Sequence, residues 1–163
     1  MMKIRVDKTK PEELDILQHM ESEAFKINEK YFEGGVLPGP PEGEKESHTW
    51  RACYEKRDFQ LASVYDGEKL IGGARMRYLS DITAEMELFF ICPEYQDKGI
   101  GAEAFLKVEN MFPEIRIWCL LTPTEVVRNA AFYINKCGYR IVEVVAYDLK
   151  TEHGMYVFEK VKY

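Results

Sequence analysis

The chain has 163 residues, of which 46% are hydrophobic, and a formal net charge of −6. This length suits one domain with a buried core, so we expect a single domain over residues 1–163, and the acidic balance argues against a nucleic-acid partner. Because no apolar run approaches the roughly 20 residues of a membrane span and the N-terminus lacks a signal-peptide pattern, we expect a cytoplasmic protein without a membrane partner.

The first part of the chain is predicted to hold a strand, a helix and a long irregular segment. Residues 2–6 alternate like an edge strand, and residues 9–25 place apolar side chains at helical spacing. Thr9 is the expected N-cap of that helix, with Glu12 completing a capping box. Residues 26–50 lose this pattern and contain four glycines and three prolines. They are either a disordered excursion or a functional loop, and we favour the loop.

The rest of the chain is predicted to alternate strands and helices. The predicted strands are residues 59–65, 69–79, 84–92, 115–121, 139–149 and 154–161. The predicted helices are residues 100–112 and 122–137, the second with Thr122 as its cap and Gly138 as its stop. Gly72 and Gly73 inside a strand suggest a bulge or a close backbone approach. This order predicts an α/β (α+β) fold, with a mixed central β-sheet flanked by helices on both faces.

The segment "PEYQDKGIG" starts at Pro93, between a predicted strand and a predicted helix. It lacks the GxxxxGK[ST] pattern of a Walker A loop. Gly99, Gly101 and Ala104 match a dinucleotide fingerprint in spacing, but residues 93–96 intervene and the next strand ends without a carboxylate. A helix N-terminus with free backbone N–H groups and glycines can instead hold a phosphate. From the residues alone, a phosphate site and a structural turn remain as alternatives.

Cysteines and histidines are scattered along the chain, without CxxC or Cys/His ligand spacing. The cysteines are Cys53, Cys92, Cys119 and Cys137, and the histidines are His19, His48 and His153. We expect the thiols to be buried hydrophobic side chains in a reducing compartment, and the histidines to be surface or capping residues. The sequence therefore predicts no metal site.

Two segments resemble the motifs of the GNAT (Gcn5-related N-acetyltransferase) superfamily. The segment "ICPEYQDKGIGAEAF" is similar to its acetyl-CoA-binding motif, Q/R-x-x-G-x-G/A after a strand, with Gln96, Gly99 and Gly101 at the motif positions. The segment "RNAAFYINKCGYR" is similar to the second cofactor segment, a helix with a tyrosine that ends in Gly-Tyr or Gly-Phe. The predicted order of strands and helices also matches the family. The resemblance thus covers nearly the whole chain and implies the GNAT acyl-CoA N-acyltransferase fold.

The resemblance implies a set of contacts to acetyl-CoA as cosubstrate, without a metal. Backbone N–H groups of residues 98–102 are expected to hold the pyrophosphate, and the strand at residues 89–91 to pair with the pantetheine arm and hold the thioester oxygen. The family often has an asparagine where this chain has Val126, and Asn129 is the expected replacement. The expected cofactor-binding residues are Phe89, Phe90, Ile91, Gln96, Asp97, Lys98, Gly99, Ile100, Gly101, Ala102 and Asn129.

The resemblance also assigns a general acid to a helix tyrosine. Family members usually place it four residues before the terminal glycine, but here Ile134 holds that position and Tyr133 lies five residues before Gly138. We expect an extra residue near the helix end, which leaves Tyr133 facing the cofactor as the acid that protonates the departing thiolate. The alternative is a half-buried tyrosine that serves only in packing.

Glu85 and Glu87 are the candidates for the base that takes a proton from the amine. They are two residues apart on a predicted strand and therefore point to one face. Counted back from Gln96, Glu85 matches the glutamate that serves as base in histone-type members, and Glu87 is the nearer alternative. Two solvated carboxylates, with a water chain as the proton path, are the remaining alternative.

These features predict an acetyl-CoA-dependent N-acetyltransferase that transfers the acetyl group directly to a primary amine of a small molecule or peptide. Cys92 and Cys137 flank the site in sequence without a nearby base, which argues against a covalent enzyme intermediate. A non-catalytic acetyl-CoA-binding sensor or regulatory module is the alternative, and the tyrosine and the strand glutamates argue against it. The expected partners are acetyl-CoA and an amine acceptor, with a homodimer left open. The acceptor side is expected after the first helix, around Tyr31, Phe32 and Trp50.

Overall fold

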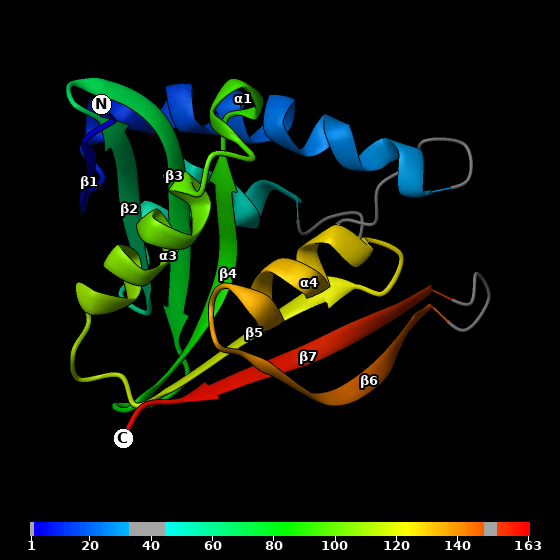
Figure 1. The fold of residues 1–163 in the computed structure, drawn as a ribbon. Helices are drawn as coiled ribbons and strands as arrows, with labels where there is room; N and C mark the ends of the chain where they lie inside the picture. Colours follow the sequence, from blue (N-terminus) through cyan, green and yellow to red (C-terminus); the bar gives the residue numbers. More distant parts are fainter. Residues whose placement is uncertain (1, 33–44, 149–152) are drawn as a thin grey trace.

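The computed structural model describes residues 2–32, 45–148 and 153–163. The strands are β1 (Ile4–Lys8), β2 (Phe59–Asp66), β3 (Lys69–Tyr78), β4 (Thr83–Ile91), β5 (Ile117–Pro123), β6 (Arg140–Asp148) and β7 (His153–Val161). The helices are α1 (Leu14–Phe25), α2 (Trp50–Tyr54), α3 (Ile100–Asn110) and α4 (Val127–Asn135), with short 3-10 helices that include η1 (Pro11–Glu13), η2 (Lys26–Tyr31) and η5 (Pro93–Tyr95). The strands form one seven-stranded sheet in the order β1-β2-β3-β4-β5-β7-β6 (Figure 1). The predicted α/β fold with a mixed central sheet is confirmed.

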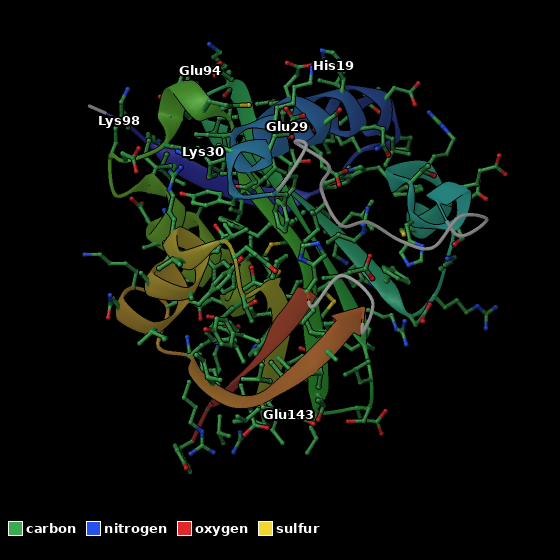
Figure 2. The ribbon with its side chains drawn as sticks, turned by 90° about the vertical axis from the view of Figure 1, so that its right-hand side faces the viewer. His19, Glu29, Lys30, Glu94, Lys98 and Glu143 are labelled. Carbon is green, nitrogen blue, oxygen red and sulfur yellow. The ribbon has the colours of Figure 1, made fainter. Side chains whose placement is uncertain are left out.

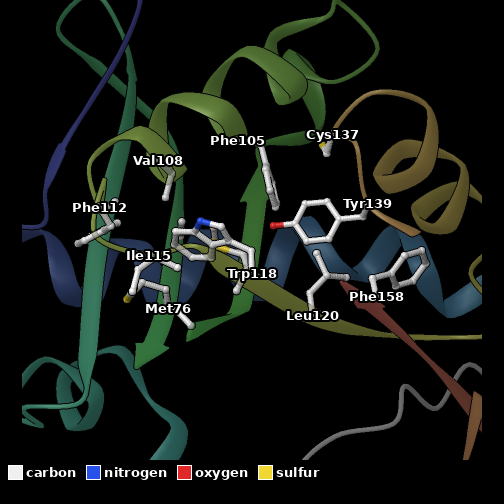
Figure 3. Close-up of a cluster of buried hydrophobic side chains, with 14 of the residues drawn as sticks. Met76, Phe105, Val108, Phe112, Ile115, Trp118, Leu120, Cys137, Tyr139 and Phe158 are labelled. Carbon is white, nitrogen blue, oxygen red and sulfur yellow. The ribbon is translucent and has the colours of Figure 1, made fainter. Parts of the chain in front are cut away.

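The helices cover both faces of this sheet, and each face has its own cluster of buried side chains. On one face, Phe105 of α3 packs in a cluster with Trp118 and Leu120 of β5 (Figure 3). On the other face, α1 and α2 cover a cluster that includes Trp50 and Phe90. Within the described residues, no helix is long and apolar enough to cross a membrane.

Strands β4 and β5 are parallel neighbours over a short stretch only. Residues 83–85 pair with residues 117–119. Beyond this stretch β5 continues along β7 to Pro123, whereas β4 stays with β3 to Ile91. The two strands therefore diverge toward one end of the sheet (Figure 1), and the edge of β4 after Glu85 has no strand partner among the described residues. An edge of this kind can accept an extended chain that pairs as an added strand.

Strand β4 also carries a β-bulge. Arg75 of β3 pairs with Leu88, but the next residue, Met76, pairs with Met86, so Glu87 is an extra residue in β4. A bulge re-aims the side chains that follow it. Consistently, Met86 belongs to the cluster under α3, whereas Leu88 packs on the cluster under α1 and α2.

The glycine pair in β3 is explained by close packing, as predicted. A Cβ atom on Gly72 would lie 2.3 Å from the backbone oxygen of Phe90, and one on Gly73 would lie 2.7 Å from the ring of Trp50. A side chain at Gly72 would push β4 away from β3, and a side chain at Gly73 would push α2 away from the sheet.

The predicted cap of the first helix is wrong by one residue. The helical segment begins with η1, whose N-cap is Lys10, and the Lys10 N–H donates to Glu13 Oε1 at 3.2 Å. Glu13 thus takes the capping-box role expected of Glu12. The Thr9 hydroxyl is instead buried 3.0 Å from the Ser63 hydroxyl of β2. This contact with the sheet competes successfully with a local cap.

The predicted start of the last helix is also wrong, and its predicted stop is confirmed. Thr122 is a buried residue of β5 that pairs with Tyr156 of β7, because the long strand pairing outweighs the local capping pattern. Helix α4 begins only after a short turn, at Val127. Gly138 has a left-handed φ of 81°, and the Tyr139 N–H beyond it donates to the Tyr133 carbonyl at 3.0 Å. This hydrogen bond joins residues six apart, one more than the corresponding bond of a Schellman motif, so the helix end contains one extra residue.

A buried carboxylate joins α3 to the end of the chain. Glu109 is 0% exposed and accepts hydrogen bonds from the Tyr139 hydroxyl and from Lys160 Nζ, each at 2.8 Å. We expect Tyr139→Phe to lower the free energy of unfolding by about 1.5–3 kcal/mol, because a hydrogen bond to a buried charge is lost. Thermal unfolding checks this, with Tyr78→Phe as the control, since the Tyr78 hydroxyl donates to Glu114 at an exposed site. Equal losses in both variants would contradict the expectation.

Candidate active site

The glycine loop turns the chain from β4 through η5 into α3. Asp97 and Gly99 both have left-handed φ angles, 60° and 77°. Gly99 is the N-cap of α3, so no side chain at the cap position accepts a hydrogen bond from the first N–H groups of the helix. The first backbone N–H groups of a helix lack intrahelical partners. Because Gly99, Gly101 and Ala102 line one large cavity, these N–H groups lie at a wall that an anion can reach.

The two motif glycines differ in what the fold requires of them. Gly99 needs its left-handed conformation, which other side chains adopt rarely. Gly101 has no such requirement, and a Cβ atom there would meet only the ring of Phe132, at 3.5 Å, which is an ordinary contact. The fold therefore does not explain the glycine at 101. The open space beside it is what a ligand approaching the backbone needs.

A residue that the motif analysis missed fixes this loop to α4. The Gln96 amide donates to the Ile91 carbonyl at 2.8 Å and accepts from Arg128 Nη2 at 2.8 Å. Arg128 also pairs with the Asp97 carboxylate at 3.2 Å. The sequence signal was present, because Arg128 directly precedes Asn129 in the second motif, but only the structure places its guanidinium on the loop.

Lys98 lies apart from this arrangement. Its side chain is exposed at the edge of the molecule (Figure 2), and its Nζ lies 5.8 Å from the ring centroid of Tyr95. Lys98 is not among the residues that line the cavity. Its backbone N–H is thus the part of Lys98 that belongs to the loop.

The cavity runs from the glycine loop along the open edge of β4 to α1 and η2. Its volume is about 1780 Å³. The predicted strand residues Phe89, Phe90 and Ile91 line it, together with Thr122 of β5 and Phe32 after η2. The diverging strands therefore lie along the wall of a space large enough for an extended cofactor arm and a second substrate.

Tyr133 lines this cavity, whereas Ile134 is 44% exposed on the outer side of α4. The Tyr133 ring packs against Phe105 and Phe158, with centroids 5.8 and 5.6 Å away. Burial raises the pKa of the Tyr133 hydroxyl, with a smaller contribution from Cys137. The hydroxyl is therefore protonated at neutral pH, as a proton donor must be.

Asn129 and Val126 also lie at the cavity wall. The Asn129 amide donates to the Thr122 hydroxyl at 3.4 Å, which joins the first turn of α4 to β5. Val126 is the N-cap of α4 and is buried.

Both strand glutamates line the cavity, but their surroundings differ. Burial raises the pKa of Glu85, and the neighbouring charge of Glu87 raises it further, against a lowering by Arg77. Glu87 forms an ion pair with Arg75, whose Nη2 lies 2.9 Å from Glu87 Oε1.

The expected acceptor side is only partly described. Phe32 and His48 line the cavity, whereas Trp50 is fully buried in the cluster under α1, with its indole N–H donating to Glu21 at 2.8 Å. Trp50 is thus a packing residue rather than a lining residue. Most of the predicted Gly/Pro-rich loop, residues 33–44, lies outside the described residues.

Comparison with known proteins identifies the family. Residues 18–139 match the acetyltransferase (GNAT) family profile. The chain belongs to the GNAT acetyltransferase family. One relative, the uncharacterized protein YrkN of Bacillus subtilis (strain 168), is 41% identical over 81 residues, which are 49% of this chain and 43% of that protein. The matched segment thus spans less than half of that relative's length.

Solved structures of several acetyltransferases share the GNAT fold of this chain. The PaiA N-acetyltransferase of Thermoplasma acidophilum, in complex with coenzyme A, has a TM-score of 0.71 and 20% identity over 98% of this chain and 99% of that one. The spermidine N-acetyltransferase of Vibrio cholerae, in complex with CoA and spermine, has a TM-score of 0.73 and 14% identity over 98% and 95%. The ribosomal-protein-S18-alanine N-acetyltransferase of Escherichia coli has a TM-score of 0.72 and 11% identity over 99% and 96%.

Proposed function

We propose that this chain is a single-domain, acetyl-CoA-dependent N-acetyltransferase that transfers the acetyl group directly to a primary amine. The observation that carries the proposal is the convergence of three features on one cavity: the glycine loop at residues 96–101, the open edge of β4 and Tyr133. The loop suits a pyrophosphate, and the open edge suits an amide-bearing arm. Tyr133 offers a proton donor in the same space.

Binding of acetyl-CoA is assigned to the loop and the strand edge. The N–H groups of residues 98–102 bind the pyrophosphate, while Gln96 and Asp97 hold the loop in shape. The backbone of residues 89–91 pairs with the pantetheine amides and donates an N–H to the thioester oxygen, where negative charge develops during transfer. Asn129 completes the contacts from α4.

Transfer forms one C–N bond and breaks one C–S bond. Glu85 or Glu87 accepts a proton from the bound ammonium, since only the neutral amine attacks the thioester carbon. As the tetrahedral intermediate collapses to the amide, the nitrogen releases its second proton to solvent, and the Tyr133 hydroxyl gives its proton to the departing thiolate and is reprotonated from solvent. Direct transfer is supported by the nearby thiols, because burial raises the pKa of Cys92 and raises that of Cys137 to about 12, which leaves neither as a ready nucleophile.

Two measurements test the proposal. Calorimetry with acetyl-CoA is expected to show one site per chain, and a panel of primary amines is expected to release free CoA thiol with at least one acceptor. Absence of heat with both acetyl-CoA and CoA would overturn the proposal. Binding without turnover across small-molecule and peptide amines would favour a sensor instead.

Arg128 gives a prediction for cofactor binding. We expect Arg128→Gln to weaken acetyl-CoA binding by roughly tenfold, a modest loss because the side chain is partly exposed and screened by solvent. The control is Arg140→Gln, which removes an exposed guanidinium that pairs with Glu159 across β6 and β7. Calorimetric Kd values that are the same for both variants would contradict a role for Arg128 in binding.

A further inference from the structure

The acceptor end of the cavity contains a group of partly buried charges around Arg75, and the proposed function leaves their roles undivided. Glu21 of α1, Arg75 of β3, and Glu85 and Glu87 of β4 all line this space. Arg75 is only 5% exposed and therefore needs a partner of opposite charge. Its choice of partner separates the two strand glutamates.

Arg75 fixes Glu87. The Arg75 Nε atom donates to Glu87 Oε1 at 3.0 Å, and Arg75 Nη2 lies 2.9 Å from the same oxygen. The two side chains are 6% and 17% exposed, so water screens this pair little. The guanidinium carbon lies 5.8 Å from the ring centroid of Trp50, which is fully buried. The bulge also sets Glu87 apart from the regular strand, so the ion pair and the bulge together fix the position of this carboxylate.

Glu85 is placed differently. Among the described residues it forms no ion pair or side-chain hydrogen bond, and the nearby Arg77 pairs with Asp58 instead, at 3.7 Å. Glu85 pairs in register with Cys119 at the last position where β4 and β5 run together. It therefore stands at the point where the strands diverge and the cavity opens.

We propose that Arg75 is a positioning residue that holds Glu87 to receive the substrate ammonium, and that Glu85 is the carboxylate that removes its proton. This division of roles rests on the proposed N-acetyltransferase function. One proton moves from the ammonium nitrogen to a Glu85 oxygen, which leaves a neutral amine and a neutral carboxylic acid. After transfer, Glu85 returns the proton to solvent.

The electrostatic surroundings fit this assignment. A base acts best when its pKa is close to the working pH, and burial together with the charge of Glu87 moves the pKa of Glu85 upward. The charged and titratable groups that act on these carboxylates or their close neighbours are Glu21 on α1, Cys53 on α2, Lys56 and Asp58 between α2 and β2, Arg75 and Arg77 on β3, Cys119 on β5 and Glu159 on β7. Arg75 is the positive group that contacts Glu87, and it does not pair with Glu85.

The test compares pH profiles of kcat/KM from about pH 6 to 10 for Glu85→Gln, Glu87→Gln and Arg75→Met, with the best amine from the panel. Glu85→Gln is expected to remove the acid-side limb, so that activity rises only as the free amine deprotonates. Glu87→Gln is expected to keep the limb but move it to lower pH, because the charge that raises the pKa of Glu85 is gone. It is also expected to raise KM for the amine about 10- to 100-fold, the loss that a hydrogen bond to a charged group carries.

Arg75→Met is expected to resemble Glu87→Gln in its raised KM for the amine, because Glu87 then loses the arginine that holds it in position. Arg75→Lys is expected to restore the wild-type behaviour in part, because lysine keeps the positive charge but lacks the planar guanidinium that can donate several N–H groups to one carboxylate. Arg51→Met is the control, because it removes an exposed arginine that pairs with Asp15. If Arg75→Met does not fold, Glu87→Gln and Arg75→Lys carry the comparison.

The outcomes are distinct. Loss of the limb in Glu87→Gln with retention in Glu85→Gln would overturn the division of roles, and so would an unchanged limb in both variants. Calorimetry with acetyl-CoA on each variant separates this failure from a failure of the proposed function. A wild-type protein that binds acetyl-CoA and turns over amines keeps the function whichever carboxylate is the base.

Discussion

Replacing Gly101 with glutamate is expected to abolish acetyl-CoA binding. The substitution places a carboxylate at the first turn of α3, on the wall of the cavity where the proposed pyrophosphate site lies. Bulk would close the approach to the backbone N–H groups, and like charge would repel the phosphates. Calorimetry is expected to show no heat at ligand concentrations that saturate the wild-type protein.

Two further variants separate binding from folding. Gly101→Ala adds only a Cβ atom in ordinary contact with Phe132, so the fold is expected to persist and any change in Kd measures bulk without charge. Leu106→Glu places the same carboxylate on the exposed side of α3, where it is expected to leave binding unchanged. Wild-type affinity in Gly101→Glu, with an unchanged melting temperature, would mean that the loop is a structural turn and not a phosphate site.

The architecture was predictable from the sequence because several independent signals agreed. The strand patterns at residues 59–65 and 69–79 and the helical pattern at residues 100–112 each specify a local structure, and the fold contains these structures as β2, β3 and α3. The glycines at 72 and 73 likewise indicated a close approach, although the groups they admit, Phe90 and Trp50, come from distant parts of the chain.

The misplaced caps have a common cause. Thr9 and Thr122 both have the side chain of a helix cap, and an acidic residue follows each of them three positions later, as in a capping box. In the structure both interact with the sheet instead, because Thr9 contacts Ser63 and Thr122 pairs with Tyr156. A local pattern states what a residue can do in a helix. The pattern does not show the competing contact with the sheet, because that contact forms only between segments that are distant in the sequence.

The cavity was harder to predict from the sequence than the helix caps. The divergence of β4 from β5 depends on where each strand finds its other neighbour, and the bulge at Glu87 depends on register with β3. Glu85 and Glu87 are two residues apart and look alike as local charges, whereas the bulge and the ion pair with Arg75 distinguish Glu87 in the structure. Long-range ion pairs and strand register carry no short-range signal, so this part of the site required the structure.

Replacing Tyr133 with phenylalanine is expected to lower kcat by about 10²–10⁴-fold while leaving acetyl-CoA affinity nearly unchanged, because general acid help is worth that factor in rate. The ring keeps its contacts with Phe105 and Phe158, so packing is preserved. The variant loses the hydroxyl group that is proposed to donate a proton in the cavity. Burial raises the pKa of this hydroxyl, so it is protonated at neutral pH.

The measurement must isolate the chemical step. Single-turnover acetyl transfer in rapid mixing reports it directly, whereas product release can conceal it in the steady state. Tyr139→Phe is the matched control, since it removes a hydroxyl from the same aromatic cluster, but one that donates to Glu109. That variant is expected to lose stability and keep its rate of transfer below the melting temperature. If Tyr133→Phe also keeps the wild-type single-turnover rate, Tyr133 serves in packing and the thiolate takes its proton from water.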